Sequence, residues 1–132
     1  INMELKDAKK VVDSLSTNNR GNILLSTNQI RKFLAGINGI QNRVLAYQGA
    51  GEIEGDKLPQ DIVDEIQYVK IKLIYQVGRN DGGRGVNPVR DLMEKADIES
   101  LMDDIGSSKK KFQAFNRYIE AIVAYHKYKG GN

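Results

Sequence analysis

The 132-residue sequence contains no cysteine and no tryptophan, and it has only one histidine and two prolines. Without cysteine there is no disulfide framework, thiolate zinc site, iron–sulfur cluster or cysteine nucleophile. A single histidine also excludes a metal site with several histidine ligands. The apolar runs are far shorter than the ~20 residues that cross a bilayer, and the lysine-containing N-terminus lacks the apolar segment of a signal peptide. We therefore expect neither a transmembrane segment nor a signal peptide.

What the sequence does contain is a globular composition with strongly segregated charge. Hydrophobic residues make up 40% and charged residues 28%, and the length predicts a single domain over residues 1–132. The net charge of +3 hides two acidic segments, 52–65 and 91–104, each with six acids and one lysine. The rest of the chain is basic, and no acid occurs from Ser14 to Gly51. This pattern favours either a nucleic-acid-binding face or solvated helix faces of alternating sign.

Apolar residues recur at every third or fourth position through most of the chain, and no useful alternation of period two is present. The spacing predicts an all-α fold, a compact bundle of about five helices. The predicted helical segments are 2–15, 26–48, 59–78, 88–96, 98–105 and 107–128, and the linkers are 16–25, 49–58, 80–86 and Gly106.

Helix-capping residues support these boundaries. Ser26 and Gln29 have the spacing of a capping box, and Pro59 suits a first helical turn. Asn87 followed by proline predicts a further helix start, and Ser107 is the predicted cap of the last helix.

Two glycine patterns resemble phosphate-binding motifs but lack their context. Residues 78–85 have the Gly-x4-Gly spacing of a P-loop, without its lysine and Ser/Thr and after a helix instead of a strand. We interpret this segment as a basic, mobile loop, and we expect Arg79, Arg84 and the nearby Arg90 to reach phosphates. Residues 36–39 match the GXXG of KH domains, but they lie inside a helical pattern, which favours close helix packing.

The remaining polar candidates do not form a catalytic or metal site. His126 has no second ligand and no serine or carboxylate partner in a known motif, so we expect a packed or hydrogen-bonded histidine near a helix end. The acids of 52–65 and 91–104 lack EF-hand spacing, which favours solvated faces or a surface for a basic partner. We therefore predict no catalytic residues, no metal and no cofactor.

Basic side chains along the long helices are the main functional candidates. Lys70 and Lys72 interrupt an apolar run, so they either snorkel past packed surface or line a groove that meets a phosphate backbone. The side chains that we predict to contact a nucleic-acid backbone are Arg31, Lys32, Arg43, Lys70, Lys72, Arg79, Arg84, Arg117 and Lys127.

Three blocks of sequence resemble the motifs of one family and occur in the same order as in that family. Residues 26–34 read STNQIRKFL, residues 68–79 read YVKIKLIYQVGR after a Leu-Pro at 58–59, and residues 112–128 read FQAFNRYIEAIVAYHKY. Together they resemble the small helical subunit of the type III-A CRISPR effector, the Csm complex. The blocks cover about half the chain, whereas residues 80–106 and the N-terminal helix match only in general character.

The resemblance implies a non-catalytic assembly protein of the prokaryotic cytoplasm with no membrane partner. Its implied partners are guide RNA and target RNA, further copies of itself in the minor filament, and the backbone and large subunits, to which cleavage and synthesis belong. Lysine and arginine suit this role because they contact phosphates without reading sequence. Opposite charge blocks suit head-to-tail stacking, so we expect the acidic segments to face protein neighbours.

Two alternatives stay open on the residues alone. One is a stand-alone helical DNA-binding protein, although no helix–turn–helix pattern is visible. The other is a structural adaptor whose basic charge is incidental, which RNA binding at graded salt would distinguish.

Overall fold

The computed structural model describes residues 5–79 and 85–131. These ranges contain six α-helices and no named strand, which confirms the all-α class and gives six helices where about five were expected. None of the helices in the described part is long and apolar enough to cross a membrane. The helices are α1 Leu5–Ser14, α2 Thr27–Gly49, α3 Gln60–Arg79, α4 Pro88–Lys95, α5 Ile98–Ile105 and α6 Lys109–Tyr128.

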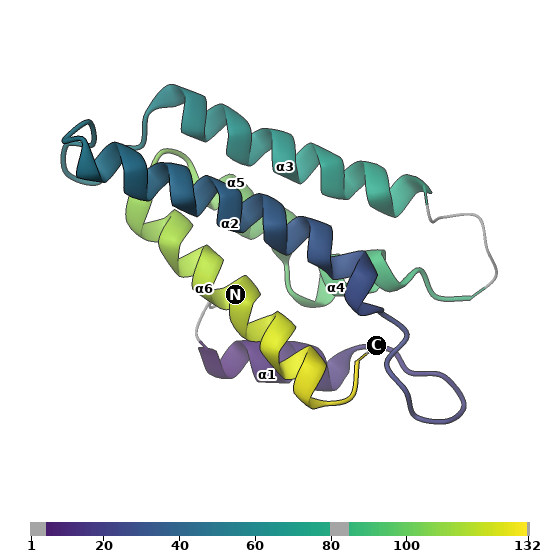
Figure 1. Ribbon diagram of the computed structural model, residues 1–132. Helices are drawn as coiled ribbons and strands as arrows, with labels where there is room; N and C mark the ends of the chain where they lie inside the picture. The colour runs from purple at the N-terminus through teal and green to yellow at the C-terminus, as the bar shows by residue number, and fades with distance from the viewer. Residues whose placement is uncertain (1–4, 80–84, 132) are drawn as a thin grey trace.

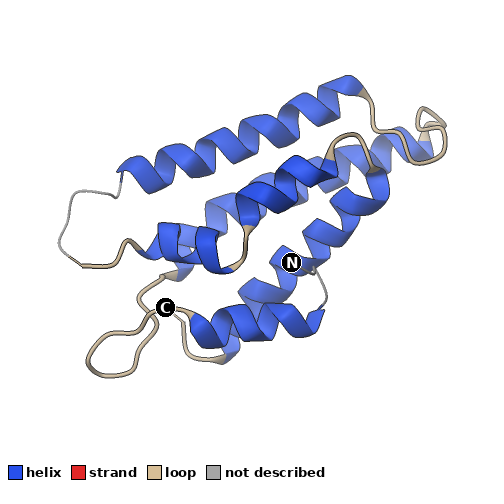
Figure 2. Cartoon of the chain, turned by 180° about the vertical axis from the view of Figure 1, so that it is seen from behind, coloured by secondary structure: helices blue, strands red, loops and turns tan. Residues whose placement is uncertain are grey.

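The two longest neighbours in sequence, α2 and α3, lie side by side and run in opposite directions (Figure 1). Helix α2 also packs against α6, while α1 packs against the C-terminal part of α6. The short helices α4 and α5 pack against α3, and α5 also contacts α6 (Figure 2). One apolar core therefore connects all six helices, and the α2–α3 pair forms one side of the bundle.

The predicted caps of α2 and α4 are confirmed. The Ser26 hydroxyl accepts a hydrogen bond from the Gln29 amide at 3.3 Å, and the Gln29 side chain accepts one from the Ser26 amide at 2.8 Å. The Asn87 side chain accepts from the Arg90 amide at 3.2 Å, with proline at the first helical position. These bonds satisfy backbone donors that the helix itself leaves without partners.

The predicted cap of α6 is wrong by one residue, because Ser108 and not Ser107 occupies the cap position. The Ser108 hydroxyl accepts from the Lys111 amide at 3.2 Å and donates to the Asp56 carboxylate at 2.5 Å. Asp56 also accepts from the Lys110 amide at 2.7 Å, and these hydrogen bonds lower the pKa of Asp56. A loop distant in sequence thus decides which serine begins the helix.

The core joins aromatic side chains of α2 and α6. The rings of Phe33 and Phe115 meet edge to face, with centroids 6.3 Å apart. Tyr118 is fully buried, and its hydroxyl donates to the Ala96 carbonyl at 3.1 Å. His126 is also buried, with Nε2 at 2.6 Å from the Leu25 carbonyl, so the expectation of a packed, hydrogen-bonded histidine is confirmed.

The GXXG pattern lies within α2, as its helical spacing predicted. A Cβ atom on Gly36 would meet Cγ2 of Val69 on α3 at 3.4 Å, whereas a Cβ on Gly39 would have no atom within 4 Å. Gly36 therefore serves close packing between α2 and α3, and Gly39 faces open space. No glycine loop of the KH type is formed at residues 36–39.

Candidate nucleic-acid interface

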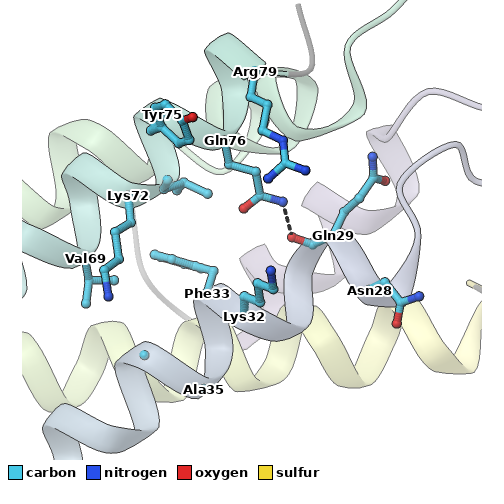
Figure 3. A pocket seen from close by; sticks show the side chains of 12 residues that line it. Asn28, Gln29, Lys32, Phe33, Ala35, Val69, Lys72, Tyr75, Gln76 and Arg79 are labelled. Carbon is cyan, nitrogen blue, oxygen red and sulfur yellow. Dashed lines mark hydrogen bonds between the residues drawn. The ribbon is translucent and has the colours of Figure 1, made fainter.

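A groove of about 750 Å³ runs between α2 and α3 (Figure 3). Its lining side chains come from the two helices alone, within residues 28–36 and 69–79. These ranges overlap the first two sequence blocks, which are more than thirty residues apart in the chain. The folded chain thus brings both blocks to one surface. The lining residues are Asn28, Gln29, Lys32, Phe33, Ala35, Gly36, Val69, Lys72, Leu73, Tyr75, Gln76 and Arg79.

Helical spacing explains why these residues share the groove. Lys72, Gln76 and Arg79 lie four and three positions apart on α3, so they project from one face of that helix. The floor is apolar and closed, because Val69 and Leu73 are buried against the core. Cationic side chains therefore stand at the rim of an apolar floor.

One hydrogen bond crosses the groove and holds its walls together. The Gln76 side-chain amide donates to the Gln29 carbonyl at 2.8 Å (Figure 3). In the same view Lys72 and Arg79 lie on either side of Gln76, and Lys32 reaches toward the groove from α2. Two walls thus carry cations, with a polar bridge between them.

The charged side chains that line the groove are all positive. No acidic side chain lines it, and the three cations Lys32, Lys72 and Arg79 have no ion-pair partner within residues 5–79 and 85–131. The Lys72 ammonium instead lies 4.6 Å from the centroid of the Tyr68 ring. Cationic side chains that form no ion pair within the described residues are available to contact the phosphates of an extended polyanion such as a nucleic acid.

Two other predicted RNA contacts already have acidic partners. Arg43 forms ion pairs with Asp61 and Glu65, and hydrogen bonding to Glu65 raises the pKa of Arg43. Tyr47 donates to Asp61 at 2.5 Å, which lowers the pKa of that carboxyl. These bonds connect the end of α2 to the start of α3.

Lys70 is the second paired cation. Its side chain is only 16% exposed, and its ammonium lies 2.5 Å from Asp103 on α5. Between the two lysines that interrupt the apolar run, Lys72 therefore faces the groove, whereas Lys70 connects α3 to α5.

The other predicted RNA-binding side chains lie elsewhere. Arg31 is exposed on α2 next to Lys32 but does not line the groove. Arg117 and Lys127 are exposed on α6, which contributes nothing to the groove lining. Arg84 lies outside the described residues. Lys32, Lys72 and Arg79 are thus the members of the predicted set that the fold brings together.

Many acids of the two acidic segments have partners within the chain. Asp56 accepts hydrogen bonds at the start of α6, and Asp91 accepts from the Ser16 amide at 2.8 Å and pairs with Lys95 at 3.1 Å. Asp104 pairs with Lys111 at 3.4 Å. Within the described ranges, Glu54, Asp64, Glu94 and Glu99 are exposed and form no ion pair.

Sequence reasoning missed the uncharged lining residues. Tyr75 is 70% exposed, and Gln29 and Gln76 form the bridge across the groove. Each lies inside a recognised block of sequence, which was the one available signal, but only the packing of α2 on α3 puts them beside the cations. No group of three or more His, Asp or Glu side chains in the described part could hold a metal ion.

Comparison with known proteins assigns the family. A family model described as Csm2 type III-A matches residues 4–132. The chain is 34% identical over 124 residues to a Streptococcus thermophilus protein named "CRISPR system Cms protein Csm2", covering 94% of this chain and 88% of that protein. An Enterococcus italicus protein of the same name is 32% identical over 136 residues, covering 96% of this chain and 89% of that one.

A Mycobacterium tuberculosis protein of the same name matches a shorter part, with 29% identity over 82 residues, 62% of this chain. The family model and the two longer matches each span nearly the whole chain. The chain therefore belongs to the Csm2 family of type III-A CRISPR systems.

Proposed function

We propose that the chain is the non-catalytic small subunit of a type III-A effector complex and that its α2–α3 groove binds the RNA backbone without sequence preference. The observation that carries the proposal is a groove with no acidic lining residue and three cations that form no ion pair within the described residues, Lys32, Lys72 and Arg79. Membership in the Csm2 family supports the proposal that this chain is a subunit of a Csm complex. Guide RNA and target RNA both supply the phosphates that such a groove takes.

RNA binding at graded salt tests the groove. Replacing Lys72 and Arg79 together with alanine should weaken binding of two unrelated RNA sequences equally. It should also reduce the slope of log K against log salt by about 2, because each lost phosphate contact contributes about 1. Lys72 is a better residue to replace than Lys70, because Lys70 already forms an ion pair with Asp103.

A matched control removes the same charge elsewhere. Lys111 and Lys129 pair with Asp104 and Asp13, at 3.4 Å and 3.5 Å. Changing these two lysines to alanine should leave the salt slope nearly unchanged. Equal losses in both double variants would mean that net charge and not the groove binds RNA, and a loss for one sequence only would refute sequence-neutral binding.

The second part of the proposal is assembly with further copies and with the other subunits. The acids that have no ion pair in the described part are the candidates for a surface that meets a basic neighbour. Glu94 on α4 and Glu99 on α5 line a second depression, whereas the proposed RNA groove is lined by residues of α2 and α3. Stacking through such a surface would be head to tail, because an acidic face of one copy meets a basic face of the next.

Charge reversal tests this surface. Glu94→Lys with Glu99→Lys should reduce co-purification with the complex while binding of free RNA holds or rises. Asp103 and Asp104 are less suitable, because their reversal would also break the ion pairs with Lys70 and Lys111. If assembly is unchanged, Glu94 and Glu99 are solvated surface residues that contact no partner.

The absence of catalysis is tested directly on the pure protein. We expect no RNA cleavage with Mg²⁺ or Mn²⁺. Metal-dependent cleavage that a point mutation in this chain abolishes would overturn the proposal. Purification of the chain without guide RNA or other subunits from a host that expresses the whole system would favour a stand-alone protein.

A further inference from the structure

The outer face of α3 exposes aromatic surface beside the groove. Tyr75 is 70% exposed and lines the groove, and Tyr68 is 57% exposed two turns earlier on the same helix. Ile71 between them is 56% exposed. Two of the three exposed tyrosines in the described part therefore lie on this face, and the third, Tyr128, is at the end of α6.

Tyr75 has no partner within the described residues. Its hydroxyl makes no hydrogen bond there and its ring meets no other ring, in contrast to the buried Tyr118 and the bonded Tyr47. Its neighbours in the groove are Lys72 on the preceding turn and Arg79 on the following one (Figure 3). An open aromatic face is thus flanked along the helix by two cations that form no ion pair with any described residue.

This combination matches the chemistry of an unpaired RNA strand. Such a strand offers a base with an apolar face between negatively charged phosphates, and proteins bind it by stacking aromatic side chains while basic residues follow the backbone. A fully paired helix keeps its bases stacked on one another, so it presents phosphates to the cations but no base face to Tyr75.

We propose that Tyr75 stacks on one base of an unpaired RNA strand while Lys32, Lys72 and Arg79 hold its phosphates. The inference rests on the proposed function, because it names the form of RNA that the same groove prefers. The ring is sequence-tolerant, since every base has a π-face, so stacking adds affinity without contradicting sequence-neutral binding.

The test compares two RNA probes of equal phosphate number, a single-stranded oligouridine and a blunt-ended duplex of two separate strands, by fluorescence anisotropy with the full chain. Wild type should bind the single strand more tightly. Tyr75→Leu should weaken single-strand binding roughly 5- to 150-fold, the range that loss of one stacked base produces, with the salt slope and duplex binding unchanged. Tyr75→Phe should restore wild-type affinity.

Tyr128→Leu is the matched control, because Tyr128 is an exposed tyrosine at the end of α6, outside the groove. Thermal melting and sedimentation velocity of each variant monitor folding and self-association. Wild-type affinity of Tyr75→Leu for the single strand would refute stacking while leaving backbone binding intact. A change in self-association alone would assign Tyr75 to a protein interface, and failure of wild type to bind either probe would refute the proposed function as well.

Discussion

Gly39→Ala tests how the GXXG pattern of α2 is used. Glycine inside a helix destabilises it by about 0.5–1 kcal/mol relative to alanine, because glycine loses more backbone freedom on folding. A Cβ atom at this position would have no atom within 4 Å, so alanine brings no clash. We therefore expect the free energy of unfolding to rise by about 0.5–1 kcal/mol.

The corresponding shift in melting temperature follows from chain length. At about 2.1 cal/mol/K per residue, 132 residues unfold with an entropy of about 0.28 kcal/mol/K. The melting temperature should rise by about 2–4 °C, measured by circular dichroism with urea unfolding as a second assay. Gly36→Ala should gain less, because its Cβ would lie 3.4 Å from Val69.

The same variants separate helix packing from RNA clamping. In a KH-type loop the glycines let the backbone approach RNA, so alanine there weakens binding. In this chain RNA affinity of Gly39→Ala should equal that of wild type. A lower melting temperature, or lost RNA binding with a stable fold, would refute the assignment of residues 36–39 to an ordinary helix.

Three further predictions concern stability. Phe115→Ala should destabilise the protein by about 3–5 kcal/mol in urea unfolding, because Phe115 is fully buried against Phe33; a cost below about 1 kcal/mol would contradict that packing. Hydrogen bonds from Ser108 and the Lys110 amide lower the pKa of Asp56. The contribution of Asp56 to stability is present above its unfolded-state pKa and is lost as pH falls through the lower folded-state pKa. The difference in free energy of unfolding between wild type and Asp56→Asn should therefore become smaller in acid. Burial raises the pKa of Tyr118 to about 12. The free energy of unfolding of wild type should therefore fall as pH rises from 10 toward 12, and that of Tyr118→Phe should fall less steeply. Equal pH dependence of the two proteins would argue against a buried hydroxyl.

Local sequence determined most of the helices. The capping box at Ser26 and the Asn-Pro start of α4 depend on residues three or four positions apart, so their bonds form within one turn. The apolar period also predicted the helical segments, because that period is a property of one helix alone. Three blocks in order then indicated the family, which the comparisons confirmed.

Tertiary packing decided which residues meet, and local patterns carry little information on that. Ser107 and Ser108 look equivalent in sequence, but the distant Asp56 selects Ser108 as the cap of α6. Lys70 and Lys72 are two positions apart, so they point to different sides of α3, where one meets Asp103 and the other the groove. The groove itself exists only because α2 and α3 pack closely and in opposite directions, which brings two separate blocks of sequence to one surface.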